Sequence, residues 1–181
     1  MILFSKGKRG KIYLDKNKAI KQTNEKRAKK EAYYLKLLNK YNIGPKFFYL
    51  KKDRFAYEFI KGPFILEYIE KNKNIKPILI DILKQCRTLD KLKINKLELH
   101  NPYKHIIIRN NKPIMIDFER CYSTNKPKNV TQFCQYLMSF KVFNLLSKKG
   151  IKFNKKDLIK LLKIYKKEQT DANFNKILDI L

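Results

Sequence analysis

The sequence predicts an α+β fold, with strands concentrated in about the first 62 residues and helices dominating the rest. Short β-rich runs in the first part indicate an antiparallel sheet, and apolar residues recur at helical spacing near 75–90 and after residue 130. With 181 residues, 44% of them hydrophobic, the chain is long and apolar enough to form a core. The strands are predicted near 11–14, 18–22, 47–50 and 55–60.

Two glycines lie among lysines just before the first predicted strand. Gly7 and Gly10, in the stretch Ser5-Lys6-Gly7-Lys8-Arg9-Gly10, have the spacing of a loop that covers phosphates, because glycine lets the backbone approach a polyphosphate. The next strand ends in Ala-Ile-Lys at Lys21, which matches part of the protein-kinase signature. An ordinary hairpin turn and a solvated lysine are the alternative interpretations.

A helix is predicted from an Asn24 cap to about Lys40. Glu31 falls inside its apolar stripe, where a carboxylate needs a buried cation, and Lys21 is the nearest candidate in sequence. Otherwise Glu31 flanks the stripe and extends into solvent. The stripe consists of Ala28, Ala32, Leu35 and Leu38.

A second hairpin is predicted over residues 106–116, with asparagines in its turn that tolerate positive φ. Asp117 follows its second strand directly. A carboxylate there is costly to bury unless a cation meets it. This position therefore suits a metal-phosphate site.

Taken in order, these signals resemble the protein-kinase-like superfamily over nearly the whole chain. Two further stretches, Ile43–Phe48 and Tyr57–Gly62, contribute to the resemblance, as does Ile-Asp-Phe-Glu ending at Glu119. The sequence is most similar to small archaeal proteins described as predicted serine/threonine protein kinases, which are relatives of RIO-type and KEOPS-complex kinases.

The resemblance implies a minimal two-lobed protein-kinase-like fold in a single domain, 1–181. A small antiparallel-sheet N-lobe with one helix would occupy about 1–62, and a reduced, mainly helical C-lobe would occupy about 63–181. The protein would then bind ATP with Mg²⁺ and transfer or release the γ-phosphate. Only 64 residues follow Asp117, without an Ala-Pro-Glu segment, so the resemblance is to a minimal kinase.

The same resemblance assigns roles to individual residues. Lys21 would hold the α- and β-phosphates, Glu31 would hold Lys21, and Asp117 would bind Mg²⁺. Glu58 to Ile60 would form the hinge whose backbone meets adenine. The other residues implied at the nucleotide are Gly7, Lys8, Gly10, Ile12 and Ala19.

The catalytic loop departs from the kinase pattern, because residues 98–105 read ELHNPYKH and contain no aspartate. Counting back from the hairpin, His105 takes the place of the asparagine metal ligand, and His100 takes the place of the catalytic aspartate. Glu98 aligns with that aspartate only if the loop carries two extra residues, so Glu98 and His100 both stay open as the base. Lys104 is the third catalytic candidate. Loop histidines without a chemical role are the alternative.

Asp-Phe-Glu, at 117–119, replaces the usual Asp-Phe-Gly and restricts the backbone swing that glycine permits. The motif resembles the corresponding segment of aminoglycoside and choline kinase-like enzymes, in which Asp-Phe-Glu or a similar sequence occurs. A small-molecule phosphotransferase is therefore one alternative function, and a catalytically weak pseudokinase is another.

Charge and cysteine content bound the remaining possibilities. A formal net charge of +27, spread along the chain, predicts contact with a polyanion such as tRNA or rRNA, or else a solvated lysine-rich surface. A basic RNA-binding module is thus a further alternative, and a protein substrate is also open. No apolar run reaches the length of a membrane span, so a cytoplasmic location is expected. Cys86, Cys121 and Cys134 are expected to be reduced thiols in the core.

Overall fold

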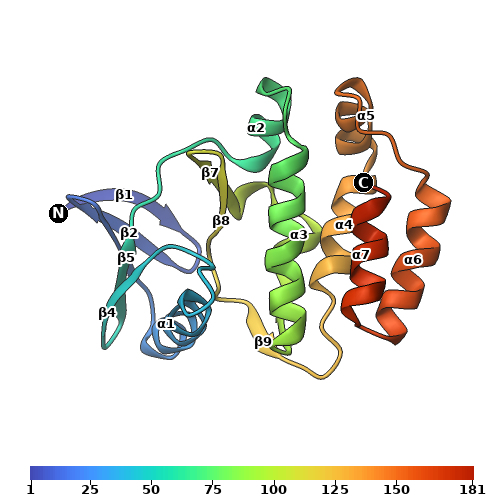
Figure 1. Ribbon diagram of the computed structural model, residues 1–181. Helices are drawn as coiled ribbons and strands as arrows, with labels where there is room; N and C mark the ends of the chain where they lie inside the picture. Colours follow the sequence, from blue (N-terminus) through green and yellow to red (C-terminus); the bar gives the residue numbers. More distant parts are fainter. The chain divides into compact units, whose positions relative to one another are not determined.

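A five-stranded antiparallel sheet organises the N-terminal part of the computed structural model, which describes residues 1–181 (Figure 1). Its spatial order is β1-β2-β3-β5-β4, and all neighbouring strands are antiparallel. The predicted strand runs are confirmed, except that the run predicted at 55–60 ends at Glu58, and β1 is an additional strand that ends at Gly7. The strands are β1 (Ile2–Gly7), β2 (Gly10–Asp15), β3 (Lys18–Gln22), β4 (Phe47–Lys51) and β5 (Arg54–Glu58).

One helix, α1 (Glu25–Asn39), packs on this sheet against β4 and β5. Asn24 caps it, since the Asn24 side chain accepts a hydrogen bond from the backbone N–H of Arg27 at 2.9 Å, as predicted. The predicted apolar stripe is buried, and Glu31 is buried within it. Helix α1 therefore presents one carboxylate on its inward face.

The remaining elements are mainly helical. They include two short two-stranded sheets, which pair β6 with β9 and β7 with β8, and two 3₁₀ turns over Leu97–His100 and Pro102–Lys104. The helices are α2 (Ile65–Lys71), α3 (Lys76–Lys91), α4 (Asn129–Met138), α5 (Phe140–Lys148), α6 (Lys155–Lys167) and α7 (Asp171–Asp179). The strands are β6 (Ile94–Lys96), β7 (Ile106–Arg109), β8 (Lys112–Met115) and β9 (Cys121–Ser123).

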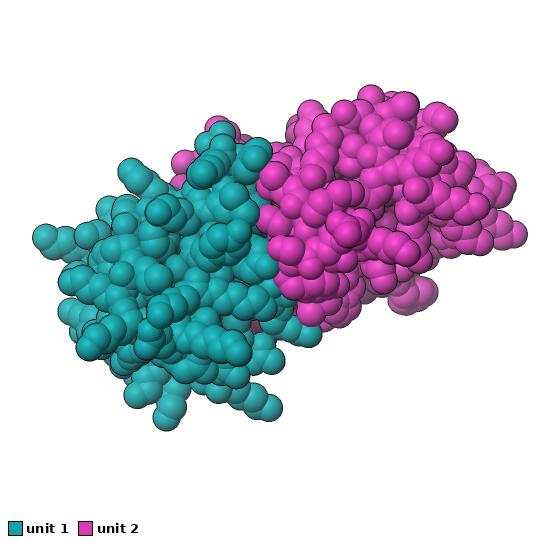
Figure 2. Space-filling model, turned by 90° about the horizontal axis from the view of Figure 1, so that it is seen from below, with its two compact units in different colours: residues 1–62, 114–121 teal, residues 63–113, 122–181 magenta.

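The chain divides into two compact units (Figure 2). Unit 1 contains Met1–Gly62 together with Ile114–Cys121, and unit 2 contains Pro63–Pro113 together with Tyr122–Leu181. The segment that carries Asp117 thus belongs with the five-stranded sheet. No helix has both the length and the apolar character needed to cross a membrane.

The β7–β8 hairpin has the predicted turn, in which Asn110 and Asn111 adopt φ of 51° and 56°. The apolar spacing after residue 130 continues to Leu146 and predicts one helix; this prediction is wrong, because the chain turns at Ser139 between α4 and α5. Ser139 has an extended ψ of 146°, and its backbone N–H and hydroxyl both donate to the carbonyl of Tyr136. All three cysteines are buried free thiols, as predicted.

A buried carboxylate ties the helices of unit 2 together. Asp90, at the end of α3, accepts hydrogen bonds from the backbone and side chain of Asn129, from the backbone of Val130 and from the hydroxyl of Tyr165. Two of these donors are the first backbone N–H groups of α4, which an intrahelical carbonyl cannot satisfy. Asp90 therefore joins α3, α4 and α6 at one point.

Gly44 in unit 1 has a conformation and surroundings that exclude other residues. Its φ is +83°, and a Cβ atom there would lie 2.8 Å from the ring of Phe118 and 2.9 Å from Leu35 Cδ1. Gly150 in unit 2 has nearly the same φ, +81°, but nothing lies within 4 Å of its Cβ position. The same substitution at the two glycines therefore distinguishes the free-energy cost of the backbone conformation from that of a steric clash.

We predict that Gly44→Ala lowers the free energy of unfolding by roughly 2–4 kcal/mol, because alanine adds both positive-φ strain and overpacking against Phe118. Gly150→Ala should cost only about 1 kcal/mol, since the strain acts alone. Urea denaturation followed by circular dichroism measures both. Equal losses would show that the Phe118 contact does not constrain this position.

Candidate functional site

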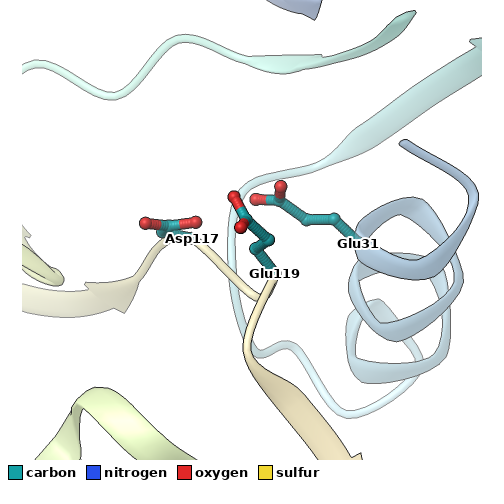
Figure 3. A group of neighbouring side chains, drawn as sticks. All are labelled: Glu31, Asp117 and Glu119. Carbon is teal, nitrogen blue, oxygen red and sulfur yellow. The ribbon is translucent and has the colours of Figure 1, made fainter. Parts of the chain in front are cut away.

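Lys21 lies at the centre of a charged cluster in unit 1. Its Nζ is 2.7 Å from Glu31 Oε2, 3.0 Å from Asp117 Oδ1 and 3.7 Å from Glu119 Oε2. The expected pairing of Lys21 with Glu31 is therefore present, and Asp117 joins it. The three carboxylates each place an oxygen within 4.8 Å of the others (Figure 3).

The fold brings these groups together from three segments. Lys21 lies on β3, an inner strand of the sheet, and pairs in register with Ile12 on one side and Phe55 on the other. Glu31 extends from α1 toward Glu119, which follows β8 on the segment carrying Asp117 (Figure 3). Strand, helix and loop each supply one part of the cluster.

The loop after β8 is held by its backbone. The N–H of Phe118 donates to Glu31 Oε1 at 3.2 Å, so Glu31 contacts the lysine with one oxygen and this loop with the other. The Phe118 side chain is buried in unit 1. Asp117 adopts φ of 61°, in the left-handed region that few residues other than glycine, asparagine and aspartate enter. Strained backbone of this kind is concentrated at functional sites.

Burial differs among the three carboxylates. The side chain of Glu31 is only 4% exposed and that of Glu119 10%, whereas that of Asp117 is 39% exposed. Asp117 is thus the member most open to an incoming ligand. Glu31 is the member whose charge depends most on its neighbours.

The electrostatics follow from three carboxylates crowding one buried cation. Burial alone lowers the pKa of Lys21, but the carboxylates of Glu31 and Asp117 outweigh burial and raise that pKa above its usual range. Burial raises the pKa of Glu31 to about 7; Asp117 and Glu119 act in the same direction, against the lowering effect of Lys21. Lys21 therefore keeps its charge, while Glu31 titrates near neutrality.

Glu119 and Arg9 belong to the cluster, although the sequence did not single them out as site residues. Arg9 Nη1 is 2.9 Å from Glu119 Oε1, which connects the turn between β1 and β2 to the loop after β8. The signal that was missed is the Asp-x-Glu spacing itself, which places a second carboxylate two residues after Asp117. The ion pair with Arg9, 110 positions away, has no local signal.

The glycine turn is a tight hairpin in which Gly7 pairs with Gly10 across the turn residues Lys8 and Arg9. A Cβ at Gly10 would lie 2.4 Å from the carbonyl oxygen of Gln22, so this position requires glycine. A Cβ at Gly7 would have no neighbouring atom closer than 3.9 Å. Of these two positions, only Gly10 requires glycine for steric reasons.

The other predicted nucleotide-site residues lie on the same sheet. Ala19 is buried on β3, and Ile12 is half-buried on β2. Glu58 ends β5, where its N–H donates to the carbonyl of Lys46, and Ile60 is buried just beyond. All of these residues belong to unit 1.

The predicted catalytic loop belongs to unit 2. Glu98 is buried, and its Oε2 lies 3.2 Å from Nζ of Lys96, which is fully buried. The Nδ1 atom of His100 lies 2.7 Å from the carbonyl oxygen of Leu97, and this histidine is exposed. The buried Lys96 partner was not anticipated from the sequence.

The two other loop candidates differ in exposure. Lys104 is exposed, with its Nζ 5.7 Å from the centre of the neighbouring Tyr103 ring. His105 is half-buried, and its backbone N–H donates to the carbonyl of Pro102 at 2.7 Å. Glu98, His100, Lys104 and His105 thus share one short segment between β6 and β7.

Comparison with solved structures defines the fold. The chain is similar to the Legionella pneumophila kinase Lpg2603 bound to IP6, with a TM-score of 0.54 and 15% identity, over 92% of this chain and 67% of that one. It is also similar to APH(2″)-IIa in a ternary complex with streptomycin and ATP, with a TM-score of 0.51 and 13% identity, over 98% and 88%. The gentamicin complex of APH(2″)-IIa gives a TM-score of 0.50 and 14% identity, over 96% of this chain and 87% of that one.

No protein-family model matches this sequence, and no curated protein matches it. The likeness is therefore one of fold. The chain has a small, kinase-like α+β fold, as the sequence predicted.

We predict that the stability of the metal-free protein depends on pH through Glu31. Its pKa of about 7 in the folded state exceeds the ordinary value of 4.5, so its stabilising contribution is complete below about pH 4.5 and is lost as pH rises through 7. The wild type should therefore lose on the order of 1–3 kcal/mol relative to Glu31→Gln between about pH 5 and pH 8. Urea midpoints across this range measure the difference, and parallel profiles for the two proteins would contradict the assignment.

Proposed function

We propose that the protein is an ATP-binding, Mg²⁺-dependent minimal kinase or ATPase that transfers or releases the γ-phosphate. The observation that carries the proposal is the cluster in which Lys21, on an inner strand, is held by Glu31 and lies 3.0 Å from Asp117. A strand lysine held by a helix glutamate is the arrangement that positions ATP phosphates in kinases. The kinase-like fold supports this interpretation.

The cluster contains the oxygen ligands that Mg²⁺ prefers. Mg²⁺ is bound through one or two carboxylates together with substrate phosphates, and Asp117 and Glu119 supply two carboxylates within 4.8 Å of each other. When bound, the ion would neutralise charge that develops on the transferred phosphoryl group. We assign Asp117 as the principal ligand because it is the most exposed of the three carboxylates.

Each remaining side chain has a defined task in this proposal. Lys21 would bind the α- and β-phosphates, and Glu31 would fix its position through the short ion pair and the Phe118 N–H. Glu119 holds Arg9 in the turn between β1 and β2, so it would keep this turn beside the phosphate-binding lysine.

We further propose that the chain is one kinase-like domain, with residues 1–62 as the N-lobe and 63–181 as the C-lobe, of which Ile114–Cys121 belongs to unit 1. Glu98 or His100 would accept the proton of the attacking hydroxyl or water, and Lys104 would assist. His105 would stand in for the asparagine that binds a second metal. A serine/threonine acceptor, and a relation to archaeal RIO-type and KEOPS-type kinases, belong to this proposal.

A small-molecule phosphotransferase is the second candidate function. It is favoured by the Asp-Phe-Glu segment and by the fold shared with APH(2″)-IIa, whose structures contain streptomycin with ATP, or gentamicin. The two functions use the same nucleotide site and differ only in the acceptor. Labelled ATP, tested with a serine-containing protein and with a panel of amino sugars, distinguishes them.

We predict that Asp117→Asn weakens Mg²⁺-dependent ATP binding by roughly tenfold or more, because a hard divalent cation loses a charged oxygen ligand. The fold should survive, since asparagine also tolerates positive φ. Asp15→Asn is the matched control, because Asp15 is exposed at the end of β2 and forms no ion pair.

Calorimetric titration with ATP, with and without Mg²⁺, measures the binding, and release of labelled γ-phosphate measures turnover. A metal dependence that is unchanged in Asp117→Asn would remove Asp117 from the site. Wild-type protein that binds Mg²⁺-ATP but never releases phosphate would identify a pseudokinase.

We predict that one of two substitutions, Glu98→Gln or His100→Gln, lowers phosphate transfer by on the order of a hundredfold to ten-thousandfold, as removal of a general base does. The other should stay close to the wild-type rate. Glu98→Gln also removes the charge opposite Lys96, so circular dichroism must confirm its fold. If both variants keep wild-type transfer, neither residue is the base.

A further inference from the structure

A lysine-lined hollow of about 980 Å³ lies in unit 2, and none of its lining residues is assigned to phosphate transfer. Its walls contain no acidic and no aromatic side chain. Six of the nine lining residues are lysines: Lys93, Lys126, Lys128, Lys163, Lys166 and Lys167. The other three are Asn125, Pro127 and Gln169.

The lysines come from three separate segments, which the fold holds together. Lys93 follows α3, residues 125–128 lead into α4, and the remaining three lysines lie at the end of α6; the loop into α4 and the end of α6 lie at the lower edge of unit 2 in Figure 1. The N–H of Thr124 donates to the carbonyl of Lys93 at 2.8 Å, and the side chain of Gln169 donates to the carbonyl of Pro127 at 2.8 Å. Convergence of the six charges is thus built into the tertiary structure.

None of the six lysines forms an ion pair. On α6, Lys163 lies three and four residues before Lys166 and Lys167, a spacing at which like charges repel. The C-terminal end of the helix dipole favours cations and accounts for the last-turn pair, but it does not account for the lysines of the two loops. Nearby, Asp171 pairs with Arg87 and Lys91, so this part of unit 2 does neutralise other cations.

The side chains that line the hollow indicate what kind of ligand it would bind. Lysine presents a point charge suited to phosphate oxygens, and six of them without acids would offset the charge of several phosphates. Without aromatic side chains, the hollow offers no platform on which unpaired bases could stack. We propose that this hollow binds a base-paired nucleic acid through its phosphodiester backbone, without reading its sequence.

This inference does not depend on the proposed phosphate transfer, because it concerns different residues in one unit. It also gives part of the +27 net charge a specific location. Binding of this kind releases counterions, so its signature is the slope of log affinity against log salt concentration.

The test compares two triple variants with the same change in charge. The hollow variant is Lys126→Gln, Lys163→Gln and Lys167→Gln. The control is Lys26→Gln, Lys30→Gln and Lys36→Gln, three exposed lysines of α1 that form no ion pairs. Fluorescence anisotropy with a labelled 20-base-pair RNA hairpin, and with the matched DNA hairpin, gives the affinity across a salt series. Circular dichroism confirms that both variants are folded.

In the hollow variant, the slope of log affinity against log salt concentration should become less steep by about two to three, since three phosphate contacts are lost. Binding at about 0.1 M salt should weaken by roughly tenfold to a hundredfold. The control should change the slope by less than about one. Similar affinity for the RNA and DNA hairpins would support backbone recognition. Equal slope changes in the two variants would overturn the proposal, and so would competition by polyglutamate as effective as that by unlabelled RNA.

Discussion

The buried amino group of Lys21 is the interaction on which unit 1 depends. A lysine on an inner strand must lose most of its hydration, and it retains its charge only because carboxylates approach from two directions. Glu31 then has a second partner in the Phe118 N–H, which holds the loop after β8. One cation thus links the sheet, the helix and a segment that lies nearly a hundred residues further along the chain.

The loop after β8 is fixed by packing as well as by charge. Phe118 occupies the space that Gly44 leaves open, and its N–H reaches Glu31. Asp117, the residue before Phe118, has a left-handed conformation, and its carboxylate, the most exposed of the three, lies beside Lys21. The arrangement sets a carboxylate next to a fixed cation, which is the feature from which we propose that this site binds a metal-bound phosphate.

Local signals were enough to predict much of this arrangement, because each acts over a few residues. Asn24 caps α1, the Asn110–Asn111 turn closes its hairpin, and the position of Glu31 within an apolar stripe indicates a buried partner. The Arg9–Glu119 and Lys96–Glu98 pairs were not predicted. The first joins the β1–β2 turn to the loop after β8, 110 positions away, so it leaves no local signal in the sequence. The second depends on the burial of both Lys96 and Glu98, which the sequence alone did not indicate.

The distribution of charge connects these observations. Acids are scarce, with 16 against 43 basic residues, yet three of them lie within 4.8 Å of one another in unit 1. Such crowding is unfavourable by itself, because Lys21 and Arg9 offset only two of the three negative charges when all three carboxylates are ionised. In unit 2 the imbalance is reversed, because six lysines surround a hollow without any acid. With its carboxylates ionised, the first cluster carries an excess of negative charge and the second an excess of positive charge, which is why we propose a divalent cation as the ligand of the first and a polyanion as the ligand of the second.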